Sequence, residues 1–194
     1  MHRFVGADKG GNIYLFQLRT NRFSRIHQAR QCVTSLVFNN NPEMHLLVGL
    51  ADGAIRVLTL DGKVLDRLRH HRAAVHCLAP YPTGEFLVSC AHDSSSLWSI
   101  SSTPRRRLRA VHPDGPVLQA CFLPDGHTLV ALTKRDGVTL HCFPSLELRA
   151  RLLLVAPSGR PLAPACLSTF ALTADGEYLL ATDGSTKAQV RPHL

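Results

Sequence analysis

The sequence predicts an all-β protein in which a unit of four short antiparallel strands is repeated along the chain. The first observation is a turn aspartate that lies between two short apolar runs and recurs at intervals of 41 to 47 residues: Asp8, Asp52, Asp93, Asp136 and Asp183. Self-similarity at about 40–45 residues is typical of the blades of a β-propeller. The second observation is that no segment keeps an apolar period of about 3.6 residues, so no amphipathic helix is expected.

Each complete unit reads as a meander of short strands separated by turns rich in Gly, Asp and Pro. The predicted first strands are 33–38, 75–80, 117–122 and 167–172, and the predicted second strands are 46–50, 86–90, 128–132 and 178–181. The predicted third strands are 55–60, 96–100 and 138–143, and the predicted fourth strands are 64–69, 106–110 and 146–152. An Asp-Gly pair between second and third strands is a strong hairpin signal, because glycine readily adopts the positive φ that such turns need.

These units divide the chain into about three full four-stranded blades with a partial blade at each end. The expected boundaries are a partial blade at 1–30, full blades at 31–71, 72–112 and 113–155, and a partial blade with a divergent tail at 156–194. Propellers typically close about four to eight blades into a ring. The sequence therefore predicts an incomplete propeller, which we interpret as a fragment, a short isoform or an incomplete gene model. An open arc of this kind leaves two blade faces uncovered.

The third unit resembles a WD40 repeat. The family pattern is a Gly-His pair, an apolar strand, a tight turn, a Ser or Thr, an Asp in the next turn and a closing Trp-Asp, and this unit carries His71, Ser89, Asp93 and Trp98 at the matching places. The resemblance implies that these four side chains form a buried structural network of hydrogen bonds. Such a network is physically reasonable, since a buried carboxylate needs partners and imidazole and indole N–H groups are donors.

This chain departs from the family pattern at several positions. His70 stands where the pattern has glycine, Trp98 comes one residue early, and Ser99 replaces the closing aspartate. In the neighbouring units Leu58 and Cys142 stand where tryptophan is expected. We therefore expect degenerate repeats held together mainly by apolar packing. The other repeated aspartates are expected to act as blade-turn residues: Asp8, Asp52, Asp136 and Asp183.

A second resemblance extends over residues 4–182, and residues 4–18, 21–23 and 30–32 sharpen it. The chain resembles the WD-repeat region of TBC-domain proteins of the centrosome and ciliary base. This implies a non-catalytic interaction scaffold that recruits partners to centriolar satellites during cilium assembly. The implied partners are centrosomal or satellite scaffold proteins, and the implied location is cytoplasmic, at the centrosome, the satellites or the basal body. The alternative is the regulatory portion of a Rab GTPase-activating protein whose catalytic TBC domain is absent here.

The chain is basic, with a formal net charge of +8. Arginines gather on the predicted fourth strands, and the densest group is Arg105, Arg106, Arg107 and Arg109. One interpretation is a solvated blade edge, where charge discourages pairing with other strands. Another is a basic interaction edge that attracts an acidic protein or an anionic surface. Nucleic acid binding is disfavoured, because no aromatic side chains alternate with these arginines to stack on bases.

The sequence predicts no enzyme, no cofactor, no metal site and no small-molecule substrate. His70 and His71 are adjacent and would point to opposite faces of a strand, so they do not form a metal site together. No Gly-rich phosphate loop and no G-x-S-x-G nucleophile elbow is present. The six cysteines form no C-x-x-C motif and are expected to be mostly small buried side chains. No apolar stretch approaches the roughly 20 residues of a membrane span.

Overall fold

The computed structural model describes residues 3–111, 116–155, 163–182 and 188–192. The described residues form five separate antiparallel sheets and one short 3₁₀ helix, η1 (Pro164–Cys166). Within every sheet the strands follow one another in chain order, as expected for a meander. The fold is therefore all-β, as the sequence predicts.

Three sheets have four strands and two sheets, one at each end of the chain, have three. The first sheet contains β1 (Arg3–Ala7), β2 (Asn12–Gln17) and β3 (Arg22–Gln28). The second contains β4 (Val33–Phe38), β5 (Leu46–Leu50), β6 (Ala54–Leu58) and β7 (Val64–Arg69). The third contains β8 (Val75–Pro80), β9 (Phe86–Ala91), β10 (Ser95–Ser99) and β11 (Arg106–Ala110).

The remaining two sheets complete the arc. The fourth contains β12 (Val117–Phe122), β13 (Thr128–Thr133), β14 (Gly137–Cys142) and β15 (Glu147–Leu152). The fifth contains β16 (Thr169–Leu172), β17 (Tyr178–Thr182) and β18 (Ala188–Pro192). Strand β16 starts two residues later than predicted, because η1 and its C-terminal residue Leu167 occupy the preceding positions.

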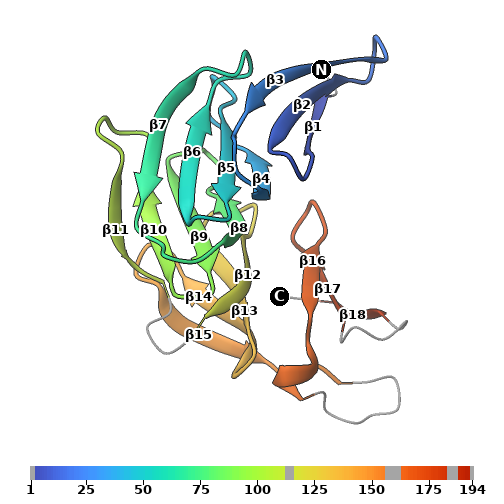
Figure 1. Cartoon of the computed structure of the whole chain (residues 1–194). Coiled ribbons are helices and arrows are strands. Elements are labelled where there is room, and N and C mark those ends of the chain that lie inside the picture. The colour runs from blue at the N-terminus through green and yellow to red at the C-terminus, as the bar shows by residue number, and fades with distance from the viewer. Residues whose placement is uncertain (1–2, 112–115, 156–162, 183–187, 193–194) are drawn as a thin grey trace.

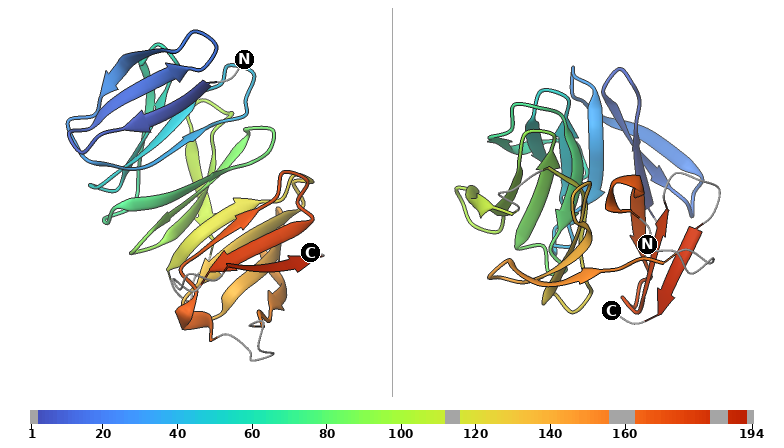
Figure 2. Two further views of the ribbon diagram at one scale, coloured as in Figure 1. Left: turned by 90° about the vertical axis from the view of Figure 1, so that its right-hand side faces the viewer. Right: turned by 90° about the horizontal axis from the view of Figure 1, so that it is seen from below.

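The sheets stand side by side like blades around a common centre (Figures 1 and 2). The first strands of the second to fifth sheets are neighbours: β4 contacts β8, β8 contacts β12, and β12 contacts β16. The β1–β3 sheet and the β16–β18 sheet lie at the two ends of the arc (Figure 1). This is the arrangement of an incomplete β-propeller.

The apolar cores lie between neighbouring blades rather than inside one blade. Strand β5 is buried along its whole length. Leu46, Val48 and Leu50 face the core shared with the first sheet, whereas Leu47 faces the core shared with the third. Successive residues of a strand point to opposite faces, so a blade buried on both faces needs a continuous apolar run. Each fully buried leucine contributes about 1.5–3 kcal/mol.

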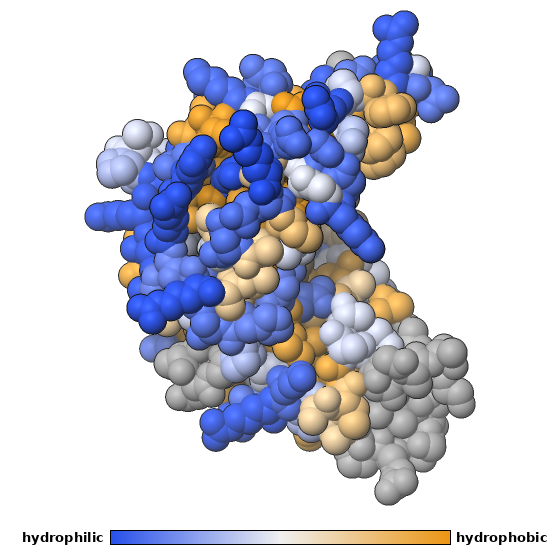
Figure 3. Space-filling view, viewed as in Figure 1, coloured by the Kyte–Doolittle hydropathy of each residue, from blue (hydrophilic) through white to orange (hydrophobic). Residues whose placement is uncertain are grey.

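The outward face of the first sheet has no neighbouring blade. The rings of Phe4, Phe16 and Phe23 stack there, with centroids 4.4 Å and 5.5 Å apart. Phe4 is 44% exposed and Phe23 is 67% exposed. Apolar side chains are visible over β1 and β2 at the upper right of Figure 3. The end of the arc is thus an exposed aromatic surface.

Candidate functional site

In the third blade His71, Ser89 and Trp98 are joined by buried hydrogen bonds, whereas the fourth residue of the predicted network, Asp93, is exposed. Trp98 Nε1 donates a 2.8 Å hydrogen bond to Ser89 Oγ, and His71 Nε2 lies 2.7 Å from the same oxygen. His71 Nδ1 lies 2.9 Å from Ser94 Oγ. A serine hydroxyl has one proton to donate. All groups are satisfied when Trp98 donates to Ser89, Ser89 donates to His71 Nε2, and His71 Nδ1–H donates to Ser94.

Asp93 stands at the edge of this network. Its Oδ1 lies 3.6 Å from His71 Nδ1, beyond the usual length of a hydrogen bond, while Oδ2 accepts a 2.9 Å bond from the backbone N–H of Arg72. Burial acts to raise the pKa of Asp93, but the Arg72 N–H and the nearby imidazole outweigh it, so the pKa lies below its ordinary value. Burial lowers the pKa of His71, which favours a neutral imidazole in the network.

The structure places three other repeated aspartates in turns between strands. Asp8 is exposed and accepts bonds from the backbone and side chain of Asn12 at 2.9 and 2.8 Å. Asp52 accepts a 3.1 Å bond from the backbone N–H of Ala54. Asp136 pairs with Arg151 at 3.3 Å. Asp183, the fifth, lies outside the described residues.

The predicted basic edge lies on and beside the fourth strand of the third blade. Strand β11 is exposed throughout and pairs only with β10, so its other side is a free sheet edge. Arg106, Arg107 and Arg109 lie on β11. Strongly hydrophilic side chains cover the outer strands on the left of Figure 3.

Several of these arginines are held in position by the protein itself. Arg105 Nε donates a 3.0 Å bond to the carbonyl oxygen of Ile100, and its Nη1 lies 3.5 Å from Asp66. Arg107 Nε donates a 3.0 Å bond to Ser96 Oγ. Arg109 donates to the carbonyl oxygen of Pro144 on the next blade. The edge is therefore an ordered row of cations.

A set of side chains that the sequence analysis did not single out links neighbouring blades at the centre. Ser35, Cys77 and Gln119 occupy the third position of β4, β8 and β12. Ser35 Oγ donates a 2.6 Å bond to the carbonyl oxygen of Val75, and Gln119 Nε2 donates a 2.7 Å bond to that of Phe170. The Cys77 thiol donates to a carbonyl oxygen of β12 at 3.6 Å. In the sequence, the feature that these residues share is a hydrogen-bond donor at the third position of a predicted first strand.

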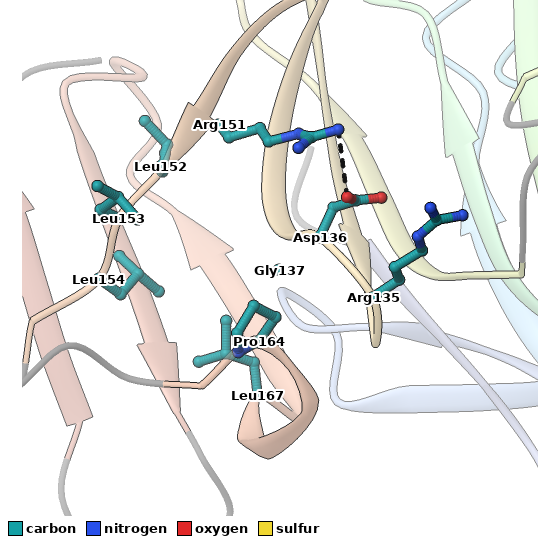
Figure 4. A pocket seen from close by; sticks show the side chains of 9 residues that line it. All are labelled: Arg135, Asp136, Gly137, Arg151, Leu152, Leu153, Leu154, Pro164 and Leu167. Carbon is teal, nitrogen blue, oxygen red and sulfur yellow. Dashed lines mark ion pairs between the residues drawn. The ribbon is translucent and has the colours of Figure 1, made fainter.

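These links surround a cavity of about 580 Å³ between the first strands of the second to fifth blades. Its wall combines apolar side chains with polar ones that are already bonded to neighbouring blades. A smaller cavity of about 210 Å³ lies between the fourth blade and η1 (Figure 4). There Leu154, Pro164 and Leu167 form an apolar wall beside the Asp136–Arg151 ion pair.

The described part of the chain contains no group of three or more His, Cys, Asp or Glu side chains that could hold a metal ion. Among the same residues, no helix is long and apolar enough to cross a membrane. The described residues also present the basic edge on β11, the aromatic face of the first sheet and the two cavities described above.

Comparison with known proteins identifies the repeat. Residues 62–99 match the WD40 family, described as WD domain, G-beta repeat. The chain carries a WD40 repeat. A chain in a structure titled "Crystal Structure of Mitotic Checkpoint Complex" superposes with a TM-score of 0.77 at 15% identity, covering 97% of this chain and 56% of that one. This likeness concerns the fold, which is an incomplete WD40 β-propeller.

Similar curated proteins share one name. TBC1 domain family member 31 of Xenopus tropicalis is 30% identical over 180 residues, which cover 92% of this chain and 16% of the relative. The protein of that name from Mus musculus is 27% identical, covering 92% and 18%. The one from Homo sapiens is 26% identical, covering 91% and 16%. The chain thus resembles TBC1 domain family member 31 over most of its own length and spans less than a fifth of these relatives.

Proposed function

We propose that this WD40-repeat region is a non-catalytic protein-interaction scaffold and that β11 binds an acidic segment of a partner protein. The observation that carries the proposal is the exposed edge strand with its ordered arginines. Its free backbone groups can pair with an added strand, and its cations complement an acidic sequence. Among the described residues Arg106, Arg107 and Arg109 form no ion pair, so their charge is available to a partner.

Similarity to TBC1 domain family member 31 supports a proposal about where this scaffold acts and which proteins it binds. On that resemblance the partners are centrosomal or satellite scaffold proteins, and the role is their recruitment during cilium assembly. The location is cytoplasmic, at the centrosome, the centriolar satellites or the basal body.

Proximity labelling in ciliated cells with the tagged chain tests this role. Enrichment of centrosomal proteins is expected, and enrichment of nucleic acid-binding proteins instead would contradict it. The same experiment with Arg106→Glu and Arg109→Glu tests the surface. A matched control carries Arg19→Glu and Arg22→Glu, which make the same change in charge on the exposed β2–β3 hairpin.

Binding to a fluorescent acidic peptide gives the quantitative test. The β11 double variant is expected to bind about tenfold more weakly, equivalent to about 1.4 kcal/mol. The control variant is expected to keep most of the affinity. Equal losses in both variants would show that overall charge, not β11, attracts the peptide.

A second candidate function is regulation of a Rab GTPase-activating protein, because the relatives are named for a TBC1 domain and this chain matches only 16–18% of their length. In that case the present chain would modulate a catalytic domain without being one. The chain alone is expected to leave the rate of Rab-bound GTP hydrolysis unchanged. Acceleration by the purified chain would overturn the non-catalytic proposal.

A further inference from the structure

Two cysteines of the third blade face each other across neighbouring strands. Cys77 on β8 and Cys90 on β9 are register partners in the antiparallel pair. Directly opposed residues in such a pair have Cα atoms about 4.5–5.5 Å apart. Disulfides bridge Cα atoms that are about 4.4–6.8 Å apart. The side chains of directly opposed residues lie on the same face of the pair, and both cysteines pack in the core between the third and fourth blades.

The two thiols differ in access. Cys90 is fully buried in the core between the third and fourth blades. Cys77 is only partly buried and lines the central cavity of about 580 Å³. A small oxidant in the cavity can therefore reach Cys77, whereas Cys90 is closed to solvent. This is the arrangement of an attacking and a resolving thiol.

The surroundings also make the two thiols unequal in acidity. The neighbouring Cys90 thiol lowers the pKa of Cys77, burial opposes this, and backbone hydrogen bonding at Ala120 adds to the lowering. The Ala120 N–H lies 3.4 Å from Cys77 Sγ as a donor. The neighbouring Cys77 and complete burial raise the pKa of Cys90. The accessible thiol is therefore the one that ionises more readily.

We propose that Cys77 and Cys90 are a redox-active dithiol that a hydroperoxide converts into an intramolecular disulfide. The Cys77 thiolate attacks one oxygen of the hydroperoxide, the O–O bond breaks, and the leaving alkoxide takes a proton from water to become an alcohol. Cys77 is then a sulfenic acid. The Cys90 sulfur attacks Cys77 Sγ, the S–S bond forms, the S–O bond breaks, and the hydroxyl leaves with the Cys90 proton as water. Two electrons pass from the sulfurs to the peroxide oxygens.

Oxidation would have a structural consequence beyond the third blade. Cys77 occupies the same place on its strand as Ser35 and Gln119, and its thiol donates to the Ala120 carbonyl oxygen on β12. The disulfide removes that proton and so this one hydrogen bond, which leaves the Ala120 N–H contact to Cys77 Sγ and the His76 Nε2 contact to the Val117 carbonyl oxygen between β8 and β12. It also ties β8 to β9 covalently. The junction between the third and fourth blades is expected to loosen while the third blade itself becomes more rigid.

The experiment treats the full chain with hydrogen peroxide, alkylates the remaining thiols after unfolding, and maps the peptides by mass spectrometry. A peptide pair linked through Cys77 and Cys90, lighter by two hydrogen atoms and restored by dithiothreitol, is expected. In the Cys90→Ser variant Cys77 should remain as a sulfenic acid that reacts with dimedone. In the Cys77→Ser variant Cys90 should stay reduced. Cys142→Ser is the control and should leave the linked pair unchanged.

Two results would overturn the proposal. One is that Cys77 and Cys90 are both alkylated as free thiols after exposed Cys32 and Cys166 have been oxidised. The other is a link from Cys77 to Cys121, whose pKa is raised by burial and further by the neighbouring Cys77. Circular dichroism of each variant shows whether it is folded. If Cys90→Ser does not fold, Cys90→Ala gives the same test. Faster amide exchange in β12 of the oxidised wild-type chain measures the expected loosening.

Discussion

The indole nitrogen of Trp98 donates a 2.8 Å hydrogen bond to Ser89 Oγ, so the third strand of the blade is tied to the second through a buried hydroxyl. The same oxygen lies 2.7 Å from His71 Nε2. Ser89 thus joins two side chains from different parts of the repeat. Because all three residues are buried, each polar group depends on the others rather than on water.

Ser89→Ala is therefore expected to destabilise the protein markedly. The substitution leaves Trp98 Nε1 and His71 Nε2 without partners, and each unsatisfied buried group costs about 1–3 kcal/mol. We expect the free energy of unfolding to fall by about 2–4 kcal/mol, measured by urea denaturation followed by circular dichroism. The control is Ser99→Ala, whose hydroxyl bonds Ser102 at the surface. If both variants lose equal stability, the buried network does not have this role.

Asp93 is expected to be more important than Asp8, although both are turn aspartates. Asp93→Ala removes the acceptor for the Arg72 N–H and the charge near His71, with an expected loss of about 1 kcal/mol for this largely exposed group. Asp8 bonds only within its own hairpin in the first sheet. Thermal unfolding of Asp93→Ala and Asp8→Ala compares them. A larger loss for Asp8→Ala would contradict the proposed network.

The sequence predicts the blades well because both faces of an inner blade are buried. The run Leu46–Leu50 is predicted at its observed limits, since a short apolar run bounded by turn residues is typical of a strand between two cores. The start of β16 is predicted two residues too early and η1 is not predicted, because a single short turn of helix has no periodic signal. The family pattern indicated His71, Ser89 and Trp98, but Ser94 as the closer partner of His71 depends on the turn geometry.

The links between blades could not be predicted from spacing alone. Ser35 and Gln119 differ in size and chemistry, and each reaches a different carbonyl group of the next blade. Their shared role, a hydrogen bond to the next blade, becomes evident only when the two sheets are packed side by side. The pairing of Cys77 with Cys90 is similar, because a register shift between Val75 and Cys77 decides which residue faces Cys90.

Gly49 is expected to be required for the close packing of the second blade against the third. A Cβ atom at Gly49 would lie 2.1 Å from Ser35 Oγ and 2.9 Å from the Val75 carbonyl oxygen. Gly49→Ala would thus displace the bond between these two residues and force the blades apart, with an expected loss of about 1–3 kcal/mol. Gly6→Ala is the matched control, since its Cβ would meet only Phe16 at 3.7 Å. Equal urea midpoints for the two variants would refute this explanation.

His27 should make stability depend on pH. Its Nδ1 lies 3.0 Å from the Gly62 carbonyl oxygen and its Nε2 lies 3.1 Å from Arg56 Nη1, so the neutral ring donates to one and accepts from the other. Burial lowers the pKa of His27 below 6.5, and the charge of Arg56 adds to the lowering, while the Gly62 bond opposes it. Protonation would remove the acceptor for Arg56 and place two cations in contact.

The direction in which stability changes with pH follows from which state, folded or unfolded, binds the proton at the higher pH. As the pH falls through 6.5 the unfolded chain binds the proton first, so stability is lost in this range and the loss levels off below the folded-state pKa. Urea unfolding between neutral and mildly acidic pH is expected to show a shallower decline for His27→Gln than for the wild type. His127→Gln, at an exposed turn, is the control and should follow the wild type. Identical slopes for all three would argue against His27 as a source of the dependence.

Gln119 is expected to control the attachment of the fifth blade. Its Nε2 donates to the Phe170 carbonyl oxygen at 2.7 Å, and its Oε1 accepts from Thr169 Oγ1 at 2.7 Å and from the Phe170 N–H at 3.0 Å. Gln119→Ala removes all three bonds at once. Amide exchange through local opening becomes faster when fewer hydrogen bonds hold a blade to its neighbour. We therefore expect amide exchange in β16 and β17 to become about tenfold faster or more. Ser35→Ala should instead affect β8, and a uniform increase over all blades in either variant would show that the links do not act locally.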